Sequence, residues 1–153
     1  MSLPSIPGHD ANCIFCKVVA GTIPAEILYN GEKVIALLDR YPIHPGHALI
    51  IPKVHCVDLL DLPSESFQEI VHTTQTVARA LVGSLKLEGF NVFSNNGAIA
   101  GQSVFHFHIH ITPRFRDDMI RFVHGHDTYA PGEMATYGER IRKHIRTGSF
   151  EGV

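Results

Sequence analysis

The residues best able to do chemistry are three histidines, His106, His108 and His110, which stand at every second position. They alternate with apolar residues, namely Phe107, Ile109 and Ile111. Side chains along a strand point to opposite faces in turn. A strand would therefore place the three imidazoles on one face, roughly 7 Å apart, with the apolar side chains facing a core. A helix would separate His108 from the other two, so the pattern predicts a strand.

This histidine face has three explanations. Chance is one, because 11 of the 153 residues are histidines, although a strict alternation of this length is rare by accident. A metal site is the second, since histidines two residues apart on a strand suit zinc. The third is a histidine nucleophile held by its neighbours, because imidazole is substantially unprotonated near neutral pH. The alternation alone does not decide between the last two.

The elements that must position this strand predict an α+β domain with an antiparallel sheet under a helix. Four further strands are indicated, at 26–29, 33–38, 47–51 and 90–94. Asn30-Gly31 favours a tight hairpin turn between the first two. Pro113 is expected to end the histidine strand, because proline cannot donate to a ladder.

Helical patterns occur three times. Apolar residues repeat at three and four over 64–87, which predicts the long helix, with Ser66 and Glu69 as a capping box and Gly89 just past the end. A short helix is expected over 14–20. A modest helix is expected over 133–146, with three apolar side chains turned inward: Tyr137, Ile141 and Ile145.

Composition limits the function classes. The chain is 44% hydrophobic and 18% charged, which suits one folded domain rather than a disordered chain. A net charge of −2 without a long basic run argues against a nucleic-acid partner. No apolar run approaches the roughly 20 residues that span a bilayer, so no membrane partner is expected. The chain shows no signal-peptide pattern and has three cysteines, which suggests a reducing cytoplasm.

The segment from His106 to Thr112 resembles the signature of the histidine-triad (HIT) family of nucleotide hydrolases and transferases. The resemblance covers roughly residues 13–114. It rests on further motifs in the same order: Cys13-Ile-Phe-Cys16, Leu38-Asp39, Pro45-Gly46-His47, Pro52-Lys-Val-His55, Ser94-Asn95-Asn96-Gly97 and Gly101-Gln102-Ser103-Val104. We therefore expect a flexible tail over 1–12, a HIT domain over 13–114 and a C-terminal extension over 115–153 packed on that domain.

The resemblance implies a five-stranded sheet in each protomer and a homodimer that joins two sheets. It assigns the catalytic role to the triad, His106, His108 and His110. His108 would be the nucleophile that forms a nucleotidyl-histidine intermediate, which water then hydrolyses. The backbone carbonyl of His110 would fix its tautomer, and the His110 side chain would assist proton transfer.

The same resemblance implies a binding site for a purine nucleotide. Asp39 would accept hydrogen bonds from the ribose, and His47 would lie near the triad. Asn95, Gln102 and Ser103 would surround the phosphate and the leaving group. The plainer alternative is a surface acid for Asp39 and ordinary turn residues for the other three.

Cys13 and Cys16 provide half of a tetrahedral zinc site. A redox pair would follow a strand in a βαβ unit, which the pattern does not show. In the zinc-bearing branch of the family the other two ligands match His55 and His106. The implied zinc is structural and ties the N-terminal segment to the triad strand.

The leading function is hydrolysis of a nucleoside phosphoramidate or a dinucleoside polyphosphate through His108. Gly101 to Val104 favours the first class, whereas Thr112-Pro113-Arg114 favours the second. One alternative is a non-catalytic purine-nucleotide-binding or scaffold protein. Another is a zinc hydrolase that uses all three triad histidines as ligands.

Overall fold

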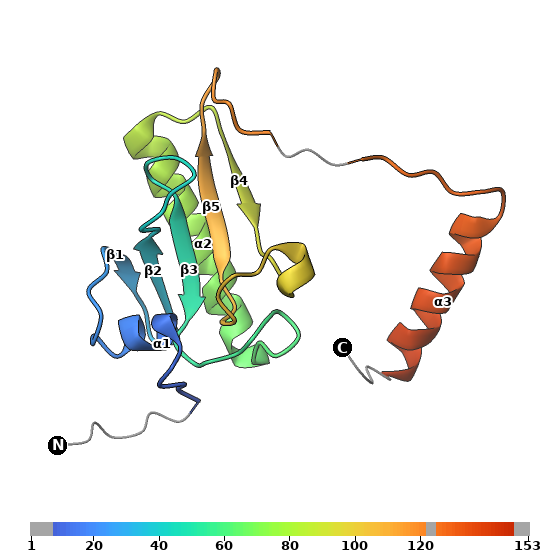
Figure 1. Ribbon diagram of the computed structural model, residues 1–153, viewed down its shortest axis with the longest axis horizontal. Coiled ribbons are helices and arrows are strands. Elements are labelled where there is room, and N and C mark those ends of the chain that lie inside the picture. Colours follow the sequence, from blue (N-terminus) through green and yellow to red (C-terminus); the bar gives the residue numbers. More distant parts are fainter. Residues whose placement is uncertain (1–7, 122–124, 149–153) are drawn as a thin grey trace. The chain divides into compact units, whose positions relative to one another are not determined.

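The computed structural model describes residues 8–121 and 125–148. The chain divides into two compact units, Met1–Asp118 and Met119–Val153. The first unit contains a five-stranded antiparallel sheet with helices, so the predicted α+β fold is confirmed (Figure 1). None of the helices in the described residues is long and apolar enough to cross a membrane.

The strands lie in the order β1-β2-β3-β5-β4. Their bounds are β1 Ile27–Asn30, β2 Val34–Leu38, β3 Ala48–Pro52, β4 Gly89–Phe93 and β5 Ile109–Arg114. The helices are α1 Ile14–Val19, α2 Ser64–Leu85 and α3 Glu133–Thr147, with a 3₁₀ turn, η1, at Ala98–Ala100. The order places β3, which follows His47, directly beside β5, which carries His110.

Both faces of the central strands are buried, so β2 and β3 are apolar at nearly every position. On one face α2 packs against the strands and buries Ile70, Val77 and Leu81 (Figure 1). On the other face Phe15 of α1 packs against Leu37 and Ile51. The sheet is thus sandwiched between the long helix and the segment that bears the two cysteines.

The ends of α2 differ from the prediction. No capping box forms, because the Glu69 carboxylate accepts the backbone N–H of Lys33 at 3.1 Å and so ties α2 to the β1–β2 hairpin. Ser66 is buried. The helix ends at Leu85, with Lys86 in the left-handed conformation at φ 55°, and Gly89 already begins β4.

The triad strand is shifted relative to the prediction. The β5 ladder begins only at Ile109 and continues through Pro113 to Arg114. Pro113 is tolerated because β3 pairs with β5 only as far as Ile111, so beyond that point β5 has a single strand neighbour, β4. His106 and His108 therefore precede the ladder and are held by other contacts.

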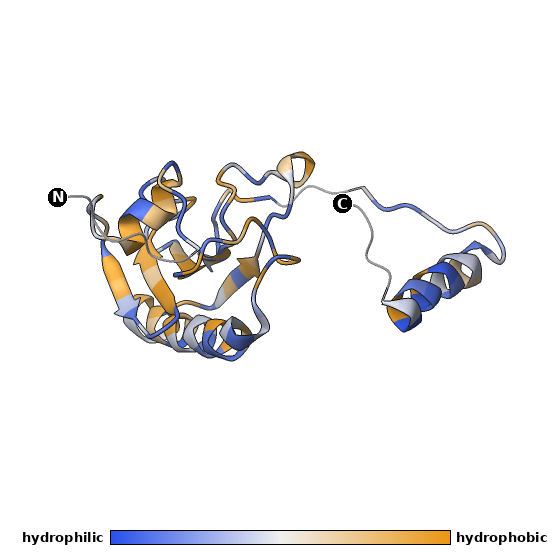
Figure 2. Cartoon of the chain, turned by 90° about the horizontal axis from the view of Figure 1, so that it is seen from below, coloured by the Kyte–Doolittle hydropathy of each residue, from blue (hydrophilic) through white to orange (hydrophobic). Residues whose placement is uncertain are grey.

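The second unit contains α3, which has no buried residue. Tyr137, Ile141 and Ile145, expected to face inward, are 47%, 57% and 66% exposed, and Figure 2 shows apolar residues among largely hydrophilic ones along this helix. The packing of the extension on the HIT domain stays a prediction. Of the expected N-terminal tail, residues 1–7 lie outside the described residues, whereas the Gly8 carbonyl accepts the backbone N–H of His55 at 2.6 Å.

Candidate active site

His108 lies just before β5 and is 5% exposed. Its Nδ1 donates a hydrogen bond to the backbone carbonyl of His106 at 2.7 Å. With the proton on Nδ1, Nε2 of the neutral ring keeps its lone pair. Burial lowers the pKa of His108, which favours this neutral form. The expectation that His110 supplies the carbonyl is wrong, because the Nδ1 of His108 turns back toward the residue two positions earlier.

A chain of hydrogen bonds runs from the β2–β3 loop to the third triad histidine. The backbone N–H of Ile43 donates to Nδ1 of His47 at 3.2 Å. Nδ1 of His47 therefore carries no proton, and Nε2 donates to Nδ1 of His110 at 2.9 Å. Neutral His110 must then carry its own proton on Nε2. This places a proton donor beside His108, with 4.7 Å between the two ring centroids.

The surroundings keep the hydrogen-bonded histidines, His47 and His110, neutral. Burial, followed by the nearby His108 and His47, lowers the pKa of His110 to about 4. Burial also lowers the pKa of His47, although the charge of Asp39 partly opposes it. Phe93 of β4 stacks on the His110 ring at 4.6 Å between centroids and fixes its plane.

Asp39 follows β2 directly and lies on the other side of His47. One carboxylate oxygen is 3.6 Å from Nδ1 of His47, and the other accepts the backbone N–H of Tyr41 at 2.9 Å. By residue type Asp39, His47 and His110 could hold a metal ion. Because both nitrogens of His47 already have partners, we interpret the group as a proton chain beside a half-buried carboxylate.

The residues expected at the phosphate divide into two kinds. Gln102 is buried, and its side chain bonds only to the backbone, donating to Val57 and Val104 and accepting from Gly97. Its amide therefore shapes the loop ahead of the triad. Ser103 is exposed, and the half-buried Asn95 makes one long bond of 3.3 Å to the Gly101 carbonyl, so these two side chains remain able to reach a ligand.

Cys13, Cys16, His55 and His106 converge, with their ligand atoms all within 4.8 Å of one another. Nδ1 of His106 is 3.3 Å from the sulfur of Cys13 and 3.6 Å from that of Cys16. Sulfur and nitrogen ligands of a tetrahedral zinc ion are about 3.6 Å apart. Nε2 of His106 donates to the Pro52 carbonyl at 2.9 Å, which leaves Nδ1 free to coordinate. The four residues thus fit zinc.

The zinc-hydrolase alternative loses its support here. The possible ligand clusters among the described residues include His106 in one and His110 in the other, but His108 in neither. His108 uses Nδ1 for the backbone and is free to act only through Nε2.

Sequence reasoning missed several contacts that hold the site together. Phe15, between the two cysteines, packs edge-on against both His106 and His108, at 5.8 and 5.1 Å between centroids. The Cys56 carbonyl accepts the backbone N–H of Phe107 at 2.7 Å. The position of Phe15 inside the cysteine motif was the one available signal. The Cys56 bond depends on how two distant segments meet.

Comparison with known proteins settles the family. Residues 20–117 match the HIT domain. The chain belongs to the HIT family. A HIT-family crystal structure from Bacillus subtilis is 38% identical and superposes with a TM-score of 0.82, over 86% of this chain and 96% of that one. Family membership places the chain among nucleotide-binding hydrolases and transferases.

Two further HIT relatives are informative. A zinc-bound histidine-triad protein from Mycobacterium smegmatis is 35% identical with a TM-score of 0.68, over 86% of this chain and 96% of that one. The Arabidopsis thaliana protein named adenylylsulfatase HINT3 is 38% identical over 109 residues, which are 71% of this chain and 55% of that protein.

Proposed function

We propose that this HIT protein hydrolyses nucleoside phosphate derivatives through a covalent nucleotidyl intermediate on His108. The observation that carries the proposal is the 2.7 Å hydrogen bond from Nδ1 of His108 to the His106 carbonyl, which leaves a lone pair on Nε2. A nucleophile needs this lone pair aimed at the reacting atom. The relative named adenylylsulfatase supports chemistry at a nucleotide phosphate.

In the first step Nε2 of His108 attacks the α-phosphorus, a P–N bond forms and the bond to the leaving group breaks. The Nε2–H of His110 donates a hydrogen bond to the leaving atom, which takes up one proton from solvent, and the hydrogen bond from His47 holds this tautomer of His110. In the second step water attacks the phosphorus, the P–N bond breaks and the nucleoside monophosphate leaves. One proton of that water is released to solvent, which balances the proton taken up by the leaving group in the first step.

A phosphoramidate fits this arrangement better than a dinucleoside polyphosphate. An amine is a poor leaving group, and the Nε2–H of His110 can donate a hydrogen bond to its nitrogen. Thr112-Pro113-Arg114 favoured the polyphosphate class, but the Arg114 guanidinium of that motif bonds to Asp118 and Asn91. Asp39 is proposed to accept from the ribose hydroxyls, with Asn95 and Ser103 at the phosphate.

Zinc is proposed as a structural ion on Cys13, Cys16, His55 and His106. Burial raises the pKa of the Cys16 thiol to about 11, so the metal must displace a tightly held proton. When bound, zinc would supply a cross-link between the N-terminal segment and the triad. The zinc-bound relative supports this assignment.

A homodimer is proposed through β4, which is an edge strand. Phe90 and Val92 on β4 are 41% and 47% exposed. They line an apolar groove of about 700 Å³ together with Val71, Ala78 and Val82 of α2. An apolar edge strand invites pairing with a second copy, which would cover it.

The free state of all three cysteines is consistent with a reducing cytoplasm.

The proposal is tested by turnover on a panel of nucleoside phosphoramidates and dinucleoside polyphosphates with purified protein. Release of nucleoside monophosphate, with the phosphoramidate preferred, is expected. A non-catalytic nucleotide-binding or scaffold protein would bind a mononucleotide and turn over none of the panel.

A further inference from the structure

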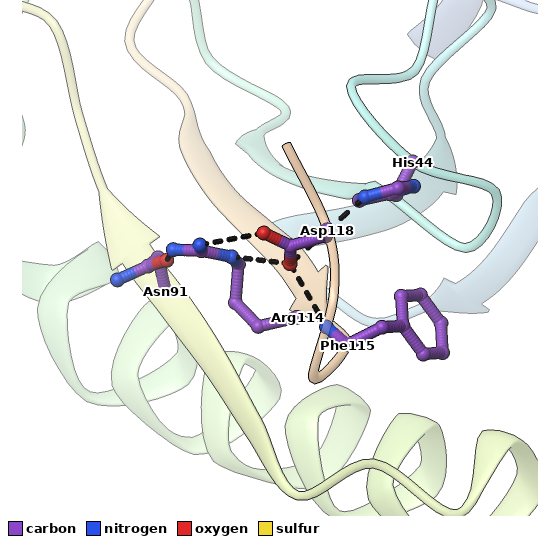
Figure 3. Close-up of polar contacts among 5 residues, drawn as sticks. All are labelled: His44, Asn91, Arg114, Phe115 and Asp118. Atoms are coloured by element: carbon purple, nitrogen blue, oxygen red, sulfur yellow. Dashed lines mark hydrogen bonds and ion pairs between the residues drawn. The ribbon is translucent and has the colours of Figure 1, made fainter. Parts of the chain in front are cut away.

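A second polar network lies at the opposite end of β5 from the triad (Figure 3). The Arg114 guanidinium donates twice to the Asp118 carboxylate, at 2.7 and 2.8 Å, and once to the Asn91 side chain at 2.7 Å. The backbone N–H of Phe115 donates to the same carboxylate at 2.9 Å. The Asp118 side chain is 2% exposed. This network fixes the turn that follows β5.

The turn touches the loop over residues 39–47 through His44. The His44 ring packs edge-on against Phe115 at 5.3 Å between centroids, and its Nε2 lies 3.9 Å from the Asp118 carboxylate. Gly46, at φ +95°, also approaches β5, since a Cβ there would lie 3.2 Å from the Pro113 side chain. His44 thus lies against a surface that Arg114 and Asp118 hold in place.

The tip of the 39–47 loop controls the tautomer of His47. The His44 carbonyl accepts the backbone N–H of His47 at 2.9 Å, and the neighbouring Ile43 donates to Nδ1 of His47 at 3.2 Å. If Ile43 moves away, nothing keeps the proton of His47 on Nε2. The bond to His110 then loses its donor, and His110 no longer needs to carry its proton toward the leaving group.

We propose that Arg114 and Asp118 are positioning residues that brace His44 and, through Ile43 and His47, hold the proton on Nε2 of His110. The inference rests on the proposed hydrolysis through His108 and assigns to a salt bridge outside the site the control of the hydrogen bond that His110 donates to the leaving group. Neither Arg114 nor Asp118 touches the substrate in this scheme.

A comparison of two leaving groups distinguishes this positioning role from a merely structural one. Asp118→Ala and His44→Ala are compared with Glu88→Ala, which removes the carboxylate of the exposed Arg116–Glu88 pair. Two substrates are used, a nucleoside phosphoramidate of an alkylamine, which needs a proton to leave, and a nucleoside 4-nitrophenyl phosphate, which does not. Asp118→Ala and His44→Ala, the two brace variants, should each lose at least about tenfold in kcat on the first substrate and less than about threefold on the second. Glu88→Ala should match wild type on both.

A second measurement does not depend on activity. Amide hydrogen exchange at Ile43 should be at least about tenfold faster in both brace variants than in wild type, while exchange in β3 stays unchanged. The nitrogen chemical shifts of His47 should show loss of the single tautomer. His44→Ala leaves the Arg114–Asp118 pair intact and serves if Asp118→Ala does not fold.

Equal losses of kcat on the two substrates, or unchanged amide exchange at Ile43, would overturn the proposal that Arg114 and Asp118 position His44. If wild-type protein turns over neither substrate, the proposed function is wrong. The proposed effect of Arg114 and Asp118 on catalysis is then wrong as well. The exchange and tautomer data would then still show whether the salt bridge holds the loop.

Discussion

The backbone carbonyl of His106 holds Nδ1 of His108 at 2.7 Å, while the His106 ring turns its own Nδ1 toward Cys13 and Cys16. His106 therefore takes part in the candidate metal centre and also orients the nucleophile, His108. This link matters because His106 and His108 precede the β5 ladder, where no strand pairing fixes the backbone.

Replacing His108 by alanine should lower kcat by at least roughly 10³, because the covalent route is removed rather than slowed. Binding of a mononucleotide should survive, since Asp39 and Asn95 are untouched. A phosphorus-labelled substrate should leave acid-labile label on wild type but not on the variant. Equal labelling of both proteins would show that another residue is the nucleophile.

His110→Ala should lower turnover of a phosphoramidate by about 10²–10³, the usual range for one lost hydrogen-bond donor at the reacting atoms. Labelling of His108 by a substrate with a good leaving group should continue, because that step needs no proton. The check is a burst experiment on both substrates. A variant that forms no intermediate from either one would place His110 in a different role.

Stability should depend on pH through His110. Its folded pKa of about 4 lies below the ordinary value, so between about pH 6.5 and 4 the unfolded chain binds more protons. The contribution of neutral His110 is therefore complete above about pH 6.5 and is lost on acidification. Urea unfolding at about pH 7.5 and about pH 5 should show a smaller loss of unfolding free energy on acidification for His110→Phe than for wild type, because phenylalanine cannot titrate. An equal loss in both proteins would contradict the assignment.

Cys13→Ala should remove most of the bound zinc and lower the free energy of unfolding, because a four-ligand site contributes to folding. Turnover per folded molecule should fall less than in His108→Ala, since the His108–His106 backbone bond remains possible. Metal analysis of protein purified without chelators checks the first part. Wild-type protein with far less than one zinc per chain would remove the claim.

Val92→Asp should break the proposed dimer, because it puts a charge on an exposed apolar position of the edge strand β4. Light scattering should give twice 16.9 kDa for wild type and 16.9 kDa for the variant. A monomeric wild type at micromolar concentration would refute the dimer.

The sequence was sufficient for features that depend on local order. The three-four repeat of α2 reflects the period of a helix, and the ordered motifs identified the family. The alternation of histidines predicted a strand, but the β5 ladder includes only His110 of the three. The convergence of Cys13, Cys16, His55 and His106 also followed from those motifs, and the structure brings all four together.

Only the tertiary structure decided which atoms meet. The pairing of β3 with β5 brings His47 to His110, 63 positions away, and Ile43 then sets the tautomer of His47. The Gln102 side chain donates to the distant Val57 carbonyl, and the Arg114 guanidinium donates to Asp118, contacts that the motifs did not predict. Hydrogen bonds depend on distances of a few tenths of an ångström between segments far apart in the chain, and only the packing of sheet, helix and loops sets those distances.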